Sequence, residues 1–63
     1  MKATIQIHEF TFMSGFFAEI IIKCAGLVGN VLTTQSCVSK GMAKRIAIQV
    51  CGELNLDYKF LED

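Results

Sequence analysis

Residues 16–25 read FFAEIIIKCA, and this stretch decides the fold. Its alternate residues form one wholly apolar side, whereas the other side places Phe17 and Ile21 between two charged residues. Alternation with a period of two is typical of a strand that buries one side. We therefore predict a strand with a core side and a mixed side. The mixed side is a candidate interface through Phe17 and Ile21.

The flanking segments predict two further strands. Residues 3–8 alternate between apolar and polar types, and the alternation slips at Glu9, which indicates a bulge or a strand end. Residues 13–15, Met-Ser-Gly, are typical of a turn. Residues 26–30 contain two glycines and an asparagine, so they predict a hairpin connection to a third strand at residues 31–35.

The rest of the chain predicts one helix and a last strand. Ser36 and Ser39 are both candidate helix caps, and apolar residues then recur at helical spacing as far as residue 54. Residues 56–60 alternate as a strand. A second helix stripe contains Ile48 and two glycines and is a further candidate contact with another subunit. The residues expected to form the sheet–helix core are Ile20, Ile22, Ala43, Ile46, Ala47, Val50, Leu54, Tyr58 and Phe60.

The expected fold is α+β, a small antiparallel sheet in the order strand-strand-strand-helix-strand with one amphipathic helix packed on one face. Its 63 residues are expected to form one domain, residues 1–63. The three cysteines lack Cys-x-x-Cys spacing and only one histidine is present. We expect neither a disulfide framework nor a metal site, a cytoplasmic location, and all three cysteines buried as small apolar residues.

The composition predicts association. Hydrophobic residues make up 52% of the chain and charged residues only 19%, below the roughly 25% of ordinary domains. A monomer this small has a high ratio of surface to volume, so the apolar excess predicts surface hidden in an interface, and the expected partner is a second copy.

The charges argue against two other classes of partner. Six basic and six acidic residues cancel, so the chain lacks the basic field expected of a nucleic-acid binder. Lys23 ends the apolar run of residues 16–22, which is far too short to span a bilayer. We expect partners of neither kind.

Catalysis is not expected. His8 is the single histidine, and no motif places a cysteine or an orienting group beside it. The carboxylates occupy positions expected to face solvent, so they do not predict an acid–base pair. We therefore expect no enzymatic activity, no catalytic residue and no cofactor.

One polar segment around the predicted helix start is a candidate ligand site. Free N–H groups and the positive end of a helix dipole favour phosphate or another anion there. An alternative interpretation also explains these residues: the serines only cap the helix and the lysines only face solvent. The candidate ligand-binding residues are Thr33, Gln35, Ser36, Ser39, Lys40 and Arg45, with His8 as a weaker addition.

Two short resemblances concern this region. GNVL at residues 29–32, with the Ser-Lys pair at 39–40, Ala43 and Ile46, resembles the strand-turn-helix pattern of a widespread family of small bacterial domains of unknown function. MKA at residues 1–3 and AKRIA at residues 43–47 are similar to short pieces of type I-F anti-CRISPR proteins, over eight residues.

In size and composition the chain also resembles phage-encoded anti-defence proteins. Some of these bind a host effector, and others are homo-oligomeric sponges that hold nucleotide-derived immune signals between subunits. The leading hypothesis is therefore a non-enzymatic, homo-oligomeric binding protein that sequesters a small anionic, nucleotide-like ligand. The alternative is a protein–protein inhibitor or adaptor of anti-CRISPR type that uses the Phe17–Ile21 face on a host protein.

Overall fold

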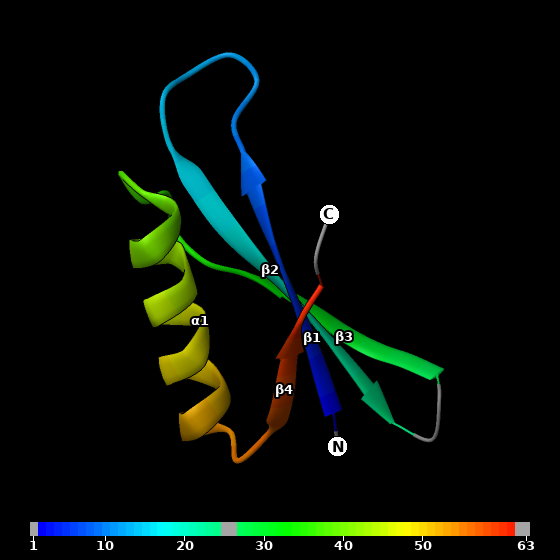
Figure 1. The fold of residues 1–63 in the computed structure, drawn as a ribbon. Helices are drawn as coiled ribbons and strands as arrows, with labels where there is room; N and C mark the ends of the chain where they lie inside the picture. Colours follow the sequence, from blue (N-terminus) through cyan, green and yellow to red (C-terminus); the bar gives the residue numbers. More distant parts are fainter. Residues whose placement is uncertain (1, 25–26, 62–63) are drawn as a thin grey trace.

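The computed structural model describes residues 2–24 and 27–61, except for the side chain of Val28, and has the expected α+β fold (Figure 1). A four-stranded sheet carries one helix on one face. The elements in chain order are β1 (Lys2–Glu9), β2 (Phe16–Cys24), β3 (Leu27–Thr33), α1 (Lys40–Glu53) and β4 (Asp57–Phe60).

The sheet is mixed, which corrects the predicted antiparallel arrangement. Its strand order is β3-β2-β1-β4, and β4 pairs with β1 in parallel, whereas the other two pairs are antiparallel. A parallel pair needs a crossover of a dozen or more residues, usually a helix. Here α1 supplies that crossover and carries the chain from the β3 edge to the β4 edge.

The phase slip at Glu9 is a strand end and not a bulge, because β1 pairs with β2 in unbroken register from Lys2 to Glu9. The irregularity lies in β3, where Ile22 pairs with Asn30 but Lys23 pairs with Val28. The intervening Gly29 is therefore the extra residue of a bulge.

The third strand begins and ends earlier than predicted. It spans residues 27–33 and not 31–35, so most of the predicted hairpin connection is strand. Residue 26 of that connection and residue 25, the predicted end of the preceding strand, lie outside the described residues. Glycine and asparagine suggested a turn, but the bulge at Gly29 accommodates them inside the strand.

The core lies between α1 and the middle of the sheet. Small residues of the helix, Ala43, Ala47 and Cys51, are fully buried and allow close approach to the strands. Half-buried residues such as Ile46, Val50 and Phe60 pack around them. The buried core residues are Ala3, Ile5, Ala18, Ile20, Ile22, Cys37, Ala43, Ala47, Cys51 and Leu56.

Two residues of the predicted core, Leu54 and Tyr58, and one cysteine predicted to be buried, Cys24, are exposed, so these three predictions are wrong. Leu54 follows the last residue of α1 and is exposed, and Tyr58 is exposed because it belongs to the short edge strand β4. Cys24 is exposed, unlike the buried Cys37 and Cys51. It ends β2 beyond the part of the sheet that α1 covers (Figure 1).

The helix begins after one of its two predicted N-cap residues. The Ser39 hydroxyl accepts a hydrogen bond from the Met42 N–H at 3.2 Å, so Ser39 is the N-cap and Ser36 is not. Asn55 follows the helix with a φ of 55°, a left-handed conformation that asparagine tolerates and that commonly ends helices.

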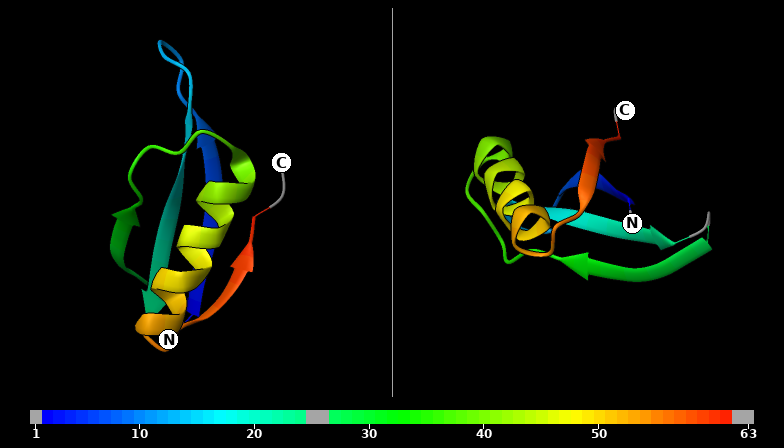
Figure 2. Two further views of the ribbon diagram at one scale, coloured as in Figure 1. Left: turned by 90° about the vertical axis from the view of Figure 1, so that its left-hand side faces the viewer. Right: turned by 90° about the horizontal axis from the view of Figure 1, so that it is seen from below.

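The helix covers only part of the sheet. It packs on β2, β1 and β4 and does not reach β3, and the β2–β3 hairpin extends beyond it (Figure 2). The molecule is consequently elongated, with extents of 36 × 20 × 18 Å. We call the sheet side opposite α1 the open face. Among the described side chains, the register places on it Lys2, Thr4, Gln6, His8, Phe17, Glu19, Ile21, Lys23, Val31, Thr33, Asp57 and Lys59.

Candidate functional site

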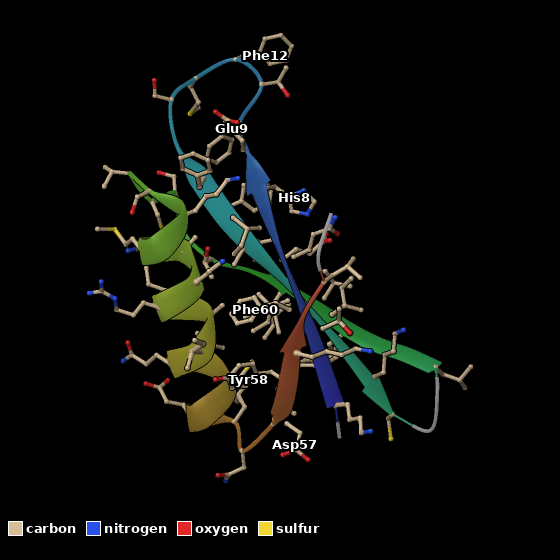
Figure 3. All side chains as sticks on the ribbon, in the orientation of Figure 1. His8, Glu9, Phe12, Asp57, Tyr58 and Phe60 are labelled. Atoms are coloured by element: carbon tan, nitrogen blue, oxygen red, sulfur yellow. The ribbon has the colours of Figure 1, made fainter. Side chains whose placement is uncertain are left out.

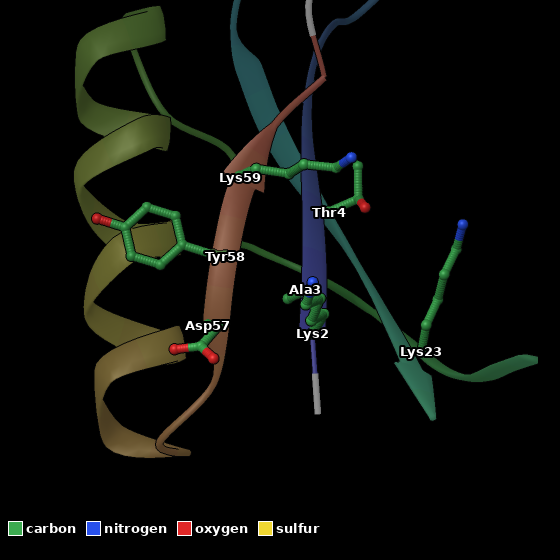
Figure 4. Close-up of a pocket in the computed structure, with 7 residues that line it drawn as sticks. All are labelled: Lys2, Ala3, Thr4, Lys23, Asp57, Tyr58 and Lys59. Atoms are coloured by element: carbon green, nitrogen blue, oxygen red, sulfur yellow. The ribbon is translucent and has the colours of Figure 1, made fainter. Parts of the chain in front are cut away.

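Three lysines from three strands surround a hollow where β1 begins (Figure 4). Lys2 belongs to β1, Lys23 to β2 and Lys59 to β4, and the hollow has a volume of about 380 Å³. We call it the lysine pocket, and its lining residues are Lys2, Ala3, Thr4, Lys23, Asp57, Tyr58 and Lys59.

The strand register explains why these residues meet. Lys2 lies directly opposite Lys23 in the antiparallel pair, and Thr4 lies opposite Lys59 in the parallel pair. Residues opposite each other point to the same side of a sheet. Figure 4 shows Lys59 extending from β4 across β1 above Thr4, while Lys23 rises from β2 on the far side of β1.

The lysine pocket is strongly cationic for a chain with no net charge. It gathers three of the six basic residues and one carboxylate, Asp57. Among the described residues, no carboxylate lies within 4.0 Å of a lysine ammonium group. Like charges directly opposite each other in a sheet are destabilising. Asp57 lies opposite Lys2 on the other side of β1 and offsets part of the repulsion between Lys2 and Lys23. Three lysines against one carboxylate still leave an excess of positive charge, so the arrangement can bind an anion.

The predicted ligand-binding residues of β3, the β3–α1 connection and α1 do not come together in one site. Thr33 and Gln35 line a groove between β3 and α1, whose helix side supplies Gln49 and Glu53. The Gln49 amide donates to the Glu53 carboxylate at 3.4 Å. This groove thus has an acid where an anion site needs a cation.

The predicted residues nearer the helix do not enter that groove. Ser36 is exposed in the connection, and the Ser39 hydroxyl already accepts the Met42 N–H. Lys40 and Arg45 are exposed on α1. Neither cation lines the groove that contains Thr33 and Gln35.

His8 lies on the open face, away from α1 (Figure 3). Its ring stacks on Phe17 with centroids 5.1 Å apart, and its Nε2 lies 3.4 Å from the Glu19 carboxylate. Phe10 packs against the same Phe17 ring at 5.0 Å. His8 is therefore part of an aromatic cluster and does not join the residues of the helix start.

The predicted interface residues occupy two surfaces. Phe17 and Ile21 are half-buried on the open face, whereas Ile48 is exposed on the outer side of α1. A single flat contact cannot use both surfaces, because the sheet and the helix separate them.

Sequence reasoning missed the lysine pocket for a physical reason. Lys2, Lys23 and Lys59 lie far apart along the chain and only the register unites them. The available signal was the polar phase of the flanking strands: Lys23 and Lys59 each occupy the mixed side of an alternating strand. The parallel pairing of β4 with β1 was needed to bring them together.

The described residues contain neither a group of three metal-binding side chains nor a helix long and apolar enough to cross a membrane. Comparisons with known proteins found that no protein-family model, no curated protein and no solved structure matches this chain.

Proposed function

We propose that this protein is a non-enzymatic binding protein that sequesters a small phosphate-bearing, nucleotide-like ligand in the lysine pocket. The observation that carries the proposal is the convergence of Lys2, Lys23 and Lys59 on one hollow. Lysine ammonium groups bind phosphate as point charges with three donors each.

The size of the lysine pocket supports a small ligand. Its volume of about 380 Å³ falls at the lower end of the roughly 300–1,000 Å³ of small-molecule sites. The Thr4 hydroxyl adds a neutral donor and acceptor beside the lysines. Asp57 faces the same hollow and disfavours ligands whose negative charge would lie against it.

The distribution of nucleophiles and bases supports binding without catalysis. Cys37 and Cys51 are buried in the core, and the exposed Cys24 does not line the lysine pocket. His8 is held on the open face by Phe17 and Glu19. A nucleophile needs a base within hydrogen-bond reach. The resemblance to anti-defence sponges suggests the biological role of the proposed binding, in the cytoplasm and as a homo-oligomer.

Thermal shift with inorganic phosphate and a panel of nucleotides tests the proposal. A ligand present at a hundredfold excess over its dissociation constant stabilises the folded state by about 2.7 kcal/mol. The double variant Lys23→Gln/Lys59→Gln should lose this stabilisation. The matched double variant Lys40→Gln/Arg45→Gln removes the same charge from the predicted helix site and should retain it.

Two outcomes would contradict the proposal. Equal loss in both double variants would mean a general charge effect, and loss only in the helix variant would restore the site predicted from sequence. Absence of a shift with every phosphate-bearing compound would remove ligand sequestration altogether.

One observation favours the alternative function, binding to a host protein. Phe12 is 99% exposed at the tip of the β1–β2 loop, next to Met13 and beside the aromatic cluster of Phe10, Phe17 and His8 (Figure 3). Exposed aromatic side chains are frequent binding hot spots. In this alternative, Phe12→Ser should abolish co-purification with one host protein and leave the folding free energy unchanged.

A further inference from the structure

The two edges of the sheet differ in how they are protected. The β4 edge is four residues long and carries Asp57 and Lys59. The β3 edge is seven residues long, LVGNVLT, and contains neither charge nor proline. Charges, proline, short length and β-bulges are means by which proteins prevent edge strands from pairing with other chains. The β4 edge is short and charged, whereas β3 has only the bulge at Gly29, and residues 30–33 beyond that bulge are regular, uncharged strand.

The hydrogen-bond alternation of β2 and β3 shows which backbone groups face the free edge. The Thr34 N–H donates to the Ala18 carbonyl oxygen at 2.9 Å, and Leu32 lies two residues back along the strand. Hydrogen-bonded and non-hydrogen-bonded residues alternate in an antiparallel pair. Leu32 therefore faces β2, whereas Val31 and Thr33 direct their N–H and C=O groups toward the free edge.

Several apolar side chains of β3 are also exposed to solvent. Leu27 is 74% and Val31 51% exposed, and Leu32 is exposed on the side of the sheet where α1 does not reach β3. Next to Leu32, the groove between β3 and α1 has a floor that includes Ile20, Ile46 and Val50. An added strand would cover apolar side chains as well as satisfy backbone groups.

The solvent-accessible surface of the chain is larger than expected for a monomer of this mass. It measures 4637 Å², about 600 Å² more than the roughly 4,000 Å² that the scaling for monomeric proteins gives for 7.0 kDa. Each partner in an interface of standard size contributes roughly 800 Å². The excess is about three quarters of the area that one partner contributes to such a contact.

We infer that β3 pairs antiparallel with β3 of a second copy, joining two sheets into one of eight strands. A two-fold axis at residue 31 sets the outward groups of Val31 opposite the partner's Val31, and an axis at residue 32 sets them opposite the partner's Thr33. An identical uncharged strand is complementary to itself in this orientation, and a two-fold contact closes the assembly at a dimer. The inference uses a different surface from the lysine pocket and does not depend on the ligand.

Sedimentation equilibrium or light scattering across micromolar to submillimolar concentrations tests the pairing. The intact chain should have twice the 7.0 kDa mass of one chain. Val31→Lys should raise the dissociation constant of the dimer at least about tenfold, because it places two like charges near the axis. Val31→Pro should do the same and keep the fold, because it removes an N–H that faces away from β2.

Two matched variants complete the test. Val38→Lys makes the same substitution at a site that is 81% exposed in the β3–α1 connection, and it should remain dimeric. Ile48→Lys changes the outer side of α1 and should also remain dimeric. A monomeric intact chain, a dimeric Val31→Lys protein with unchanged affinity, or dissociation by Ile48→Lys would overturn the inference. Circular dichroism of each variant reports whether the fold is kept.

Discussion

The part of the sheet under α1 and the β2–β3 hairpin beyond it differ although β2 runs through both. Ala18 and Ile20 of β2 are buried under the helix, whereas Cys24 at the end of the same strand is exposed. The alternation of residue types is continuous across this boundary. Burial in this molecule is therefore decided by where the helix ends, and the strand pattern alone does not reveal it.

The same boundary separates stability from proposed binding. The fully buried side chains lie between α1 and the sheet. The lysine pocket takes Lys23 from the hairpin end of β2, and the proposed dimer contact is β3 itself. Substitutions under the helix should consequently act on folding, and substitutions in the hairpin should act on binding.

The largest expected difference between the two regions comes from removing one aliphatic side chain from each. Ile5 is 0% exposed in the core, so Ile5→Ala should cost about 2–5 kcal/mol of folding free energy. Leu27→Ala in the hairpin should cost less than about 0.5 kcal/mol. Urea unfolding at concentrations where the chain is monomeric measures both. Equal costs would mean that the hairpin belongs to the folding core.

A smaller difference is expected between two glycines. Gly15, before β2, has a φ of 133°, and an added Cβ would lie 3.1 Å from the Cys37 carbonyl oxygen. Gly15→Ala should therefore cost about 1–3 kcal/mol. At Gly29, in the hairpin, the nearest atom would be 3.6 Å away, an ordinary contact. Gly29→Ala should be neutral or slightly stabilising, and thermal unfolding distinguishes the two outcomes.

Much of the fold could be predicted because it depends on local patterns. The alternation of residues 16–24 indicated β2, and the helical spacing of Ala43 and Ala47 with the Ser39 cap indicated α1. The start of β3 could not be predicted in this way, because glycine and asparagine are typical of turns and a bulge absorbs them here. The exposure of Tyr58 depends on its place in an edge strand, which is a tertiary property.

The candidate site was less predictable than the fold for a related reason. Lys40 and Arg45 are close in sequence near the helix start, so the sequence pattern indicated a site there, whereas Lys2 and Lys59 become neighbours only through the parallel pairing of β4 with β1. That pairing depends on α1 crossing the sheet from one edge to the other. A site assembled by such a crossover leaves no motif with fixed spacing.

The smallest effect, which is absent at neutral pH, concerns the cysteines of the two regions. Burial raises the pKa of the Cys51 thiol, because the core disfavours the thiolate. Below the ordinary value of 9.0, folded and unfolded chains both keep the proton, and stability is unaffected. Above it, the unfolded chain releases a proton that the folded chain retains. Stability therefore falls as the pH rises through and above this value.

The contribution of one thiol cannot exceed about 1.4 kcal/mol per pH unit. Urea unfolding from neutral to alkaline pH should show this fall in the intact chain and in Cys24→Ala. Cys51→Ala should be less stable at neutral pH, because it loses packing, and should lack this part of the alkaline fall. Identical pH slopes for Cys51→Ala and Cys24→Ala would mean that the buried thiol ionises without unfolding. Comparing the two variants cancels the titration of the groups that both chains share.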